Sequence, residues 1–175
     1  YKLGMAKTVC EDWANLLLSE KVAIKAGIYE KRLCEILNFN NFYTRGNQLV
    51  EMAFSLGTGA FVEYLNADGQ VVIDYIRADM IYPVSWDNGD VTECAFGTPK
   101  TIGGKNVVYI QIHRFGRKDQ GENPDAYYIE NVYVDADSEK EMDPPEEIEE
   151  IVNTGSVEPL FQLITPNICN NIDLD

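Results

Sequence analysis

Hydrophobic residues recur at helical spacing through the first third of the chain. Such spacing places apolar side chains on one face of a helix, which then packs against the rest of the protein. The pattern predicts three helices, which span Thr8–Val22, Ile28–Leu37 and Phe42–Leu56. In the first helix, Thr8 and Glu11 have the form of a capping box, and Trp13 is expected on the inner face with Leu16 and Leu17.

The inner faces of the other two predicted helices follow from the same spacing. In the second helix the inward residues are expected to be Ile28, Leu33, Ile36 and Leu37. In the third helix one apolar stripe is formed by Leu49, Met52, Ala53 and Leu56. Gly57 follows the last stripe residue, where a left-handed helix cap favours glycine. The third helix is therefore predicted to end at this glycine.

After Gly57 the period changes from helical to two, which is typical of β-strands. The predicted strands are Ala60–Leu65, Gln70–Ile76, Val91–Phe96, Val107–Phe115 and Ala126–Val134, with Leu160–Thr165 as a last strand or extended segment. Turn residues separate them at Asn66–Gly69, Ser85–Gly89 and Gly103-Gly104. The Asp-Gly pair in the first of these turns predicts a hairpin.

Three segments of the chain are predicted to be connections. Ala78–Pro83 is expected to be a connector, since proline cannot occupy a central ladder position. Gly116–Pro124 is a polar loop, and Asp135–Glu150 is an acidic insertion that contains prolines. Helices come first and strands follow, which predicts an α+β fold with a mostly antiparallel sheet. We expect a helical segment at 1–57 and a β-rich portion at 58–175, with the acidic loop at 135–150, as one compact unit of a longer protein.

The chain is strongly acidic, with 14 Lys and Arg against 29 Asp and Glu, a formal net charge of −15. Such a charge repels phosphate backbones and excludes tight binding of nucleic acid by this segment. It suits a surface that lies near DNA without adhering to it, and equally an ordinary soluble protein. No secretory signal and no apolar run of membrane-spanning length is present. Both ends, Tyr1 and Asp175, are expected to be cuts in a longer protein.

The four cysteines do not form a recognised site. Cys10, Cys34, Cys94 and Cys169 are too far apart in sequence for a C-x-x-C unit. Neither a zinc ribbon nor a redox motif is therefore predicted. We expect buried, reduced thiols of a cytosolic protein.

Two further features resemble catalytic or nucleotide sites only in part. Gly57-Thr58-Gly59 follows a helix and precedes a strand, whereas a phosphate loop follows a strand and precedes a helix. His113 is the only histidine, which excludes a metal cluster built on several histidines. It shares a strand face with Tyr109 and Gln111, opposite Val108, Ile110 and Ile112. We expect His113 on the more polar face, as a surface or interface residue.

The acidic insertion mimics a calcium loop without fulfilling its pattern. Asp135, Asp137 and Glu139 alternate, and Glu146 stands at the twelfth position. Lys140 occupies the position that such a loop reserves for glycine. A solvated acidic loop is the favoured interpretation. The crowded acids Glu146, Glu147, Glu149 and Glu150 do not suggest the opposed carboxyl pair of a glycosidase.

Aromatic residues concentrate in the strand region. They are Tyr75, Tyr82, Trp86, Phe96, Tyr109, Tyr127, Tyr128 and Tyr133. Core and cross-strand packing explains such residues in a sheet. A subunit interface, where tyrosine and tryptophan are enriched, is the alternative. Both interpretations stay open from sequence.

Three segments together resemble a known protein family. They are TGAFVEYL at Thr58–Leu65, VVIDYIRADMIYPVSWDNGDVTECAF at Val71–Phe96 and LITPNICNNIDLD at Leu163–Asp175. These segments resemble the portal proteins of tailed bacteriophages, in the group from phages and prophages of Gram-positive bacteria. The resemblance spans most of the chain and is weaker in Tyr1–Asn41 and Gly116–Glu150. It implies an α+β wing region of a portal.

The resemblance also implies a role and its partners. Portal proteins form a ring, usually of twelve subunits, at one vertex of the virion capsid, and assemble in the host cytoplasm. A terminase pumps double-stranded DNA through the ring, and a head–tail connector docks beneath it. The portal hydrolyses nothing, so no catalytic, cofactor-binding or metal-binding residue is predicted here. The parts that line the channel, such as the stem helix and tunnel loop, are not expected in this segment.

Two other classes of function compete with the portal reading. An acidic protein-binding adaptor, which mimics the charge of DNA, predicts acids on one face and a stable monomer. A hydrolase with unrecognised carboxylates predicts a deep pocket lined by acids of raised pKa. The portal reading instead predicts extended surfaces left uncovered.

Overall fold

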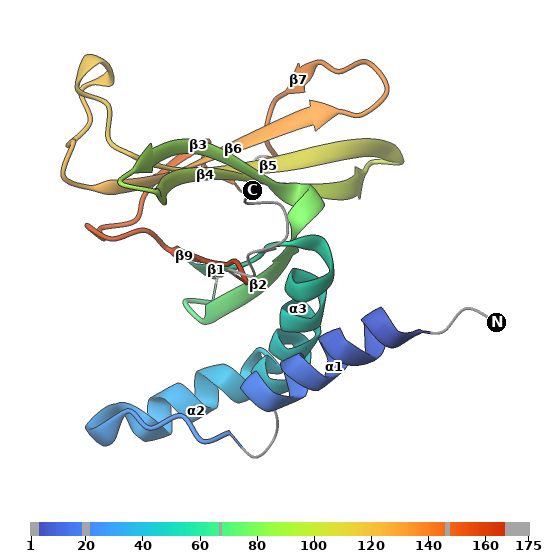
Figure 1. The fold of residues 1–175 in the computed structure, drawn as a ribbon. Helices are drawn as coiled ribbons and strands as arrows, with labels where there is room; N and C mark the ends of the chain where they lie inside the picture. Colours follow the sequence, from blue (N-terminus) through green and yellow to red (C-terminus); the bar gives the residue numbers. More distant parts are fainter. Residues whose placement is uncertain (1–3, 19–21, 67, 146–147, 167–175) are drawn as a thin grey trace. The chain divides into compact units, whose positions relative to one another are not determined.

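The computed structural model describes residues 4–18, 22–66, 68–145 and 148–166. The fold is α+β, with three α-helices followed by mostly antiparallel strands, as the sequence predicts (Figure 1). The chain divides into two compact units, Tyr1–Ala78 with Phe161–Asp175, and Asp79–Leu160. The division therefore falls at Ala78 rather than at the expected boundary after Gly57. The first β-hairpin belongs with the helices because it pairs with β9 (Phe161–Ile164) and packs on the third helix.

The helices of the first unit are α1 (Met5–Leu17), α2 (Glu30–Phe39) and α3 (Phe42–Leu56), with a 3₁₀ turn η1 (Gly27–Tyr29) before α2. The bounds of α3 match the prediction, and Gly57 ends it in the left-handed conformation (φ 94°). The first helix starts and ends earlier than predicted, and residues 19–21 lie outside the described residues. It packs on α3 through Ala14 and Leu18, which are buried (Figure 1).

The expected start and inner face of α1 were wrong. Thr8 donates from Oγ1 to the carbonyl of Gly4 and caps nothing, while Glu11 pairs with Lys7. Trp13 stacks on Phe54 but remains 47% exposed. Leu16 and Leu17 are exposed as well. The small residue Ala14 makes the close approach to α3 instead, so the larger residues Leu16 and Leu17 face solvent.

Other helical residues also differ from the expected inner faces. Ile28 is 90% exposed because it lies in η1, outside the periodic part of α2. Leu37 is buried, and Leu33 and Ile36 are half-buried, as their spacing indicates. In α3 the buried residues are Gly46, Leu49, Val50 and Ala53, whereas Leu56 at the helix end is exposed.

A three-stranded sheet completes the first unit, in the order β2-β1-β9. β1 (Gly59–Leu65) and β2 (Val71–Arg77) form the predicted hairpin. Oδ1 of Asn66 accepts hydrogen bonds from the backbone N–H groups of Asp68 and Gln70, which fixes the turn. Gly69 takes the positive φ (70°) that the turn requires.

The outer edge of β2 is bound by a side chain from the helical layer. Asn40, between α2 and α3, is 5% exposed. Its Oδ1 accepts from the N–H of Ile73 at 2.8 Å, and its Nδ2 donates to the carbonyls of Val71 and Ile36, both at 2.9 Å. The hydroxyl of Tyr75 donates to the Asn40 carbonyl. One amide thus joins the helices to the sheet.

The second unit is built on a larger antiparallel sheet. Its strands are β3 (Ile81–Asp87), β4 (Asp90–Ile102), β5 (Lys105–Phe115), β6 (Tyr127–Asp135), β7 (Glu141–Met142) and β8 (Ile151–Asn153). The strands lie in the order β3-β4-β5-β6-β7, and β8 also pairs with β6 (Figure 1). Short 3₁₀ turns stand at η2 (Ala78–Met80) and η3 (Lys118–Gln120).

The connector expected at Ala78–Pro83 is wrong in its second half. Ile81 begins β3, and Pro83 lies within this strand, paired with Cys94. β3 is an edge strand, so Pro83 avoids a central ladder position as its chemistry requires. The turn between β3 and β4 consists of Asn88 and Gly89, and is shorter than the predicted turn Ser85–Gly89. Both residues have positive φ, which suits a tight hairpin.

The two faces of this sheet differ in burial. One face carries Cys94, Phe96, Val107, His113, Tyr127, Ile129 and Tyr133, all buried. The opposite face carries Val108, Ile110, Ile112, Val132 and Val134, which are only half-buried. The aliphatic side of the sheet is therefore the more exposed one, the reverse of what the alternation in β5 suggested.

Candidate functional site

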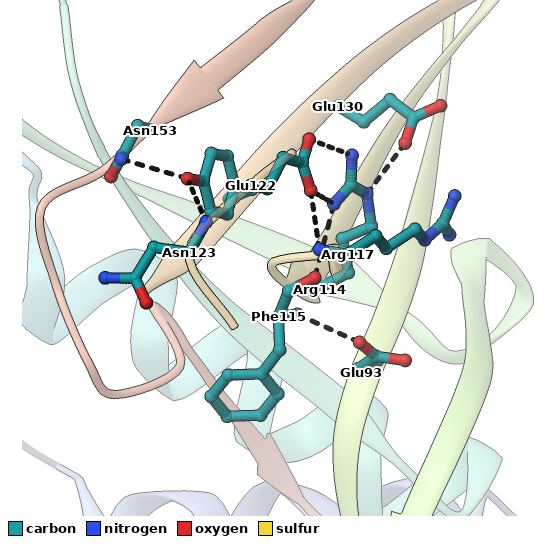
Figure 2. Close-up of polar contacts among 9 residues, drawn as sticks. Glu93, Arg114, Phe115, Arg117, Glu122, Asn123, Glu130 and Asn153 are labelled. Carbon is teal, nitrogen blue, oxygen red and sulfur yellow. Dashed lines mark hydrogen bonds and ion pairs between the residues drawn. The ribbon is translucent and has the colours of Figure 1, made fainter. Parts of the chain in front are cut away.

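A buried arginine near the end of β5 organises a charged site in the second unit (Figure 2). The side chain of Arg114 is 1% exposed. Its Nε donates to Glu130 on β6 at 2.8 Å. Its two terminal nitrogens donate to the carboxylate of Glu122 at 2.6 and 3.0 Å, a bidentate pair. We call these three residues the Arg114 cluster.

The Arg114 cluster holds the loop that follows β5. Glu122 Oε2 also accepts from the backbone N–H of Arg117 at 2.8 Å. The carboxylate of Glu122 therefore binds both the side chain of Arg114 and the backbone of Arg117 at the start of the loop. Arg114 reaches the carbonyl of Phe115 as well. The loop is polar, as predicted, but these bonds order it against the sheet (Figure 2).

The charges in the cluster reinforce one another. Hydrogen bonding to Arg114 lowers the pKa of Glu122 to about 2. Hydrogen bonding to Glu122, followed by that to Glu130, raises the pKa of Arg114. The carboxylate of Glu122 and the guanidinium of Arg114 therefore stay ionised across the physiological pH range.

A second set of bonds extends the cluster to β4 and β8. The hydroxyl of Tyr128 accepts from the backbone N–H of Asn123 and from Nδ2 of Asn153, both at 3.2 Å (Figure 2). Glu93 accepts from the backbone N–H of Phe115 at 2.9 Å. All of these bonds join one segment of the chain to another. The arrangement acts chemically as a clamp on the loop, and we assign it a structural role.

His113 precedes the clamp arginine and is buried, so the expected surface or interface position was wrong. It is 0% exposed, with its ring edge-on to Phe96 at a centroid distance of 5.3 Å. Its strand face is also filled by Cys94 and Tyr127 from the neighbouring strands. The side chains of neighbouring strands help to bury this face, and the sequence of β5 alone does not reveal them. Burial lowers the pKa of His113 to about 4.

We expect His113 to make the protein sensitive to mild acid. The unfolded chain binds a proton at this residue below pH 6.5, whereas the folded protein binds it only near pH 4. Stability should therefore fall as the pH drops from 6.5 to 4, by about 3 kcal/mol in total, and no further below that range. Urea unfolding of the protein and of His113→Phe at a series of pH values measures this effect. The variant should lack this part of the decline; parallel curves for the two proteins would refute the assignment.

The described part of the acidic insertion begins with a turn that is held by local hydrogen bonds. Asp135 Oδ1 accepts from the backbone N–H groups of Asp137 and Ser138, which caps the turn between β6 and β7. The hydrogen bond from the backbone N–H of Ser138 contributes most to lowering the pKa of Asp135. Among the described residues, no group of three or more metal-ligating side chains comes together. Glu146 and Glu147 lie outside the described residues.

The expectation of buried thiols holds for one described cysteine. Cys94 is 0% exposed, and burial raises the pKa of its thiol to about 11. Cys10 is half-buried, and Cys34 on α2 is exposed, so burial was wrong for Cys34. Cys169 lies outside the described residues.

These differences predict an order of thiol reactivity. At pH 8, Cys34 should react with a thiol reagent roughly 100-fold or more faster than Cys94, because Cys34 is exposed to the reagent, whereas Cys94 is buried and its thiol has a raised pKa. Mass spectrometry of the labelled peptides reads both sites in one sample. The Cys34→Ser variant is the control, and it should leave Cys94 protected until denaturant is added. Equal labelling of Cys34 and Cys94 in the native protein would contradict the burial of Cys94.

The remaining candidates from sequence are explained by structure. Gly57-Thr58-Gly59 joins α3 to β1, and the Thr58 hydroxyl donates to the carbonyl of Ile164 on β9. The aromatics divide into buried and exposed residues. Phe96, Tyr127, Tyr128 and Tyr133 are buried, whereas Tyr82 and Trp86 on the edge strand β3 are exposed.

The structure also adds a residue that sequence reasoning missed. Arg114 lies on the same face of β5 as Ile110 and Ile112, because it continues their two-residue spacing. A charged residue in such a place needs a buried partner. The charged Arg114 in an otherwise aliphatic pattern was therefore the signal that the sequence offered, although the pattern alone does not identify the partners.

Comparison with protein-family models and with curated proteins gives no match. Within the described part of the chain, none of the helices combines the length and the apolar character needed to cross a membrane. The longest of them, α3, has 15 residues.

Proposed function

We propose that this chain is a wing-region segment of a phage portal protein, a structural subunit of the ring at the capsid vertex. In that role it has no enzymatic activity. It forms part of the conduit for packaging and ejection of DNA, and it works beside other portal subunits, terminase, capsid and head–tail connector proteins in the virion. The proposal rests on the resemblance of Thr58–Leu65, Val71–Phe96 and Leu163–Asp175 to portal proteins. Residues 167–175 of the last segment lie outside the described residues.

The single structural observation that supports the proposal is the extent of uncovered apolar surface. Large exposed hydrophobic side chains occur on α1, on η1 and α2, and on β3, as in Leu16, Ile28 and Trp86. Monomeric proteins rarely leave wide apolar areas in water. Such surfaces are expected of a subunit that is covered within an assembly.

The distribution of charge supports an acidic adaptor as a second candidate. Residues 1–57 contain seven Lys and Arg against six Asp and Glu, a net charge of +1. Residues 58–175 contain seven against 23, a net charge of −16. An acidic surface this strong would also suit a module that binds basic protein surfaces.

Negative-stain electron microscopy of the full-length gene product that contains this chain tests the proposal. Rings with a central channel are expected. A uniform monomer or small dimer, at all salt and protein concentrations tried, would overturn the portal proposal and favour the adaptor.

A further inference from the structure

Strand β9 lies in the sheet of the first unit, although the chain reaches it only after passing through the whole second unit (Figure 1). Four residues of β9 pair with β1, from Phe161 opposite Val62 to Ile164 opposite Gly59. At its other edge β1 pairs with β2 through the short turn of the hairpin. The pairing of β1 with β2 is therefore local in sequence, whereas the pairing of β1 with β9 is not.

β9 has few interactions of its own on β1. Phe161, Leu163 and Ile164 are only half-buried, and Gln162 is exposed. The hydroxyl of Thr58 adds one bond at the end of the strand, where it donates to the carbonyl of Ile164 at 3.2 Å. A strand pairing this short, with half-buried side chains, is marginal in water. Its stability therefore depends strongly on how much chain entropy is lost when it forms.

The second unit is bound to β6 until just before β9 begins. Thr154 donates through its backbone N–H and its hydroxyl to the carbonyl of Tyr127, at 3.0 and 2.7 Å. The N–H of Tyr127 in turn donates to the carbonyl of Ser156 at 2.8 Å. Residues 157–160 then lead directly to β9, and residues 78–80 of η2 join β2 to β3. Both connections between the second unit and the small sheet are therefore short.

A folded second unit shortens the free chain that must close when β9 pairs with β1. When the second unit is unfolded, the 83 residues 78–160 lie between β2 and β9. When it is folded, the free connections are 78–80 and 157–160, seven residues in all. The probability of closing a flexible chain falls with about the 3/2 power of its length. Folding of the second unit should therefore favour the pairing of β9 with β1 roughly 40-fold.

We propose that β9 is a strap on the first unit, which stays paired with β1 only while the second unit is folded. When the second unit unfolds, β9 leaves β1, whereas α3 and the β1–β2 hairpin stay folded. They pack on one another and are joined through Asn40. Departure of β9 uncovers one edge of β1, and an open edge can pair with another extended segment. The strap is a property of the fold of this chain and does not rest on the proposed function.

Pulsed hydrogen exchange of the 175-residue chain at increasing urea concentrations tests the strap. Mass spectrometry follows peptides from β9, β6 and α3 separately. Arg114→Leu removes the guanidinium that binds Glu122 and Glu130 in the second unit. The β6 peptide should therefore become labelled at a urea concentration roughly 1 M or more below that of the unmodified chain. The β9 peptide should shift with it, whereas the α3 peptide should keep its midpoint.

Arg117→Leu is the matched control, because it removes an exposed arginine from the same loop, and it should shift none of the three peptides. A β9 peptide that stays protected where the β6 peptide of Arg114→Leu is fully labelled would overturn the proposal. Loss of protection in α3 together with β6 and β9 would overturn it as well, because the two units would then unfold as one.

A longer connection tests the strap without destabilising the second unit. About 14 Gly and Ser residues inserted between Glu158 and Pro159 lengthen the free chain threefold, from seven residues to about 21. Without denaturant, the protection of the β9 peptide against exchange should fall roughly fivefold. The β6 and α3 peptides should keep their protection, since the insertion lies outside both elements. Unchanged protection of β9 in this variant would contradict the dependence of the strap on a short connection.

Discussion

Replacing Arg114 with leucine should lower the free energy of unfolding by about 3–5 kcal/mol. The substitution leaves Glu122 and Glu130 without the guanidinium that both contact at 2.6–3.0 Å. Glu122 is largely buried, with an exposed side-chain fraction of 11%, so water replaces the lost partner poorly. The loop that Glu122 fixes through the N–H of Arg117 should loosen as well. Urea unfolding followed by circular dichroism measures the loss.

Arg117→Leu is the matched control for this prediction. Arg117 is an exposed arginine in the same loop, and its bond to Glu122 comes from its backbone N–H, which the substitution keeps. Its effect should stay within about 0.5 kcal/mol. Combining Arg114→Leu with Glu122→Gln and Glu130→Gln should recover part of the loss, because no charge is then left unpaired. Equal stabilities of Arg114→Leu and Arg117→Leu would show that the cluster does not act as a clamp.

Replacing Asn40 with alanine should cost about 3–4 kcal/mol, because it leaves two backbone groups of the edge strand β2 unpaired at once. These groups are the N–H of Ile73 and the carbonyl of Val71. The same amide also binds the carbonyl of Ile36, so the junction between the helices and the sheet should loosen. Hydrogen exchange at Ile73, read together with urea unfolding, should show the local effect and the global one.

Asn38→Ala provides the control for Asn40, since it makes the same substitution two residues earlier at an exposed position. It should change stability by less than about 0.5 kcal/mol. Asn40→Asp should also destabilise the protein, because a carboxylate can accept from Ile73 but cannot donate to the carbonyls of Val71 and Ile36. Retention of full stability by Asn40→Asp would mean that the donor half of the amide is dispensable.

The order and type of most elements could be predicted from sequence because local signals are strong there, whereas the strands β3, β7 and β8 were not predicted. The bounds of α3 follow from its apolar period and from Gly57, which stops the helix. The β1–β2 hairpin follows from a turn whose Asn66 and Gly69 suit its geometry. In each case a few residues close together in sequence determine the local structure.

The faces of the elements could not be predicted in the same way. Whether His113 is buried depends on Phe96, Cys94 and Tyr127, which come from other strands. Whether Trp13 is buried depends on the close approach of α1 to α3 at Ala14. The same limit applies to Arg114, whose partner Glu122 is eight residues away across a loop. These outcomes rest on packing between segments, which periodicity does not encode.

The side chain of Asn40 has a further consequence for how copies of this protein can meet. Open strand edges invite another chain to add a strand, which leads to aggregation. Asn40 already occupies the hydrogen-bonding groups of β2 at Val71 and Ile73, and in the other sheet Pro83 and the irregular register beside it interrupt the edge of β3. Growth by strand addition is therefore blocked at both places. At these two edges, contacts between copies are left to side chains, which can select a partner as a row of backbone groups cannot.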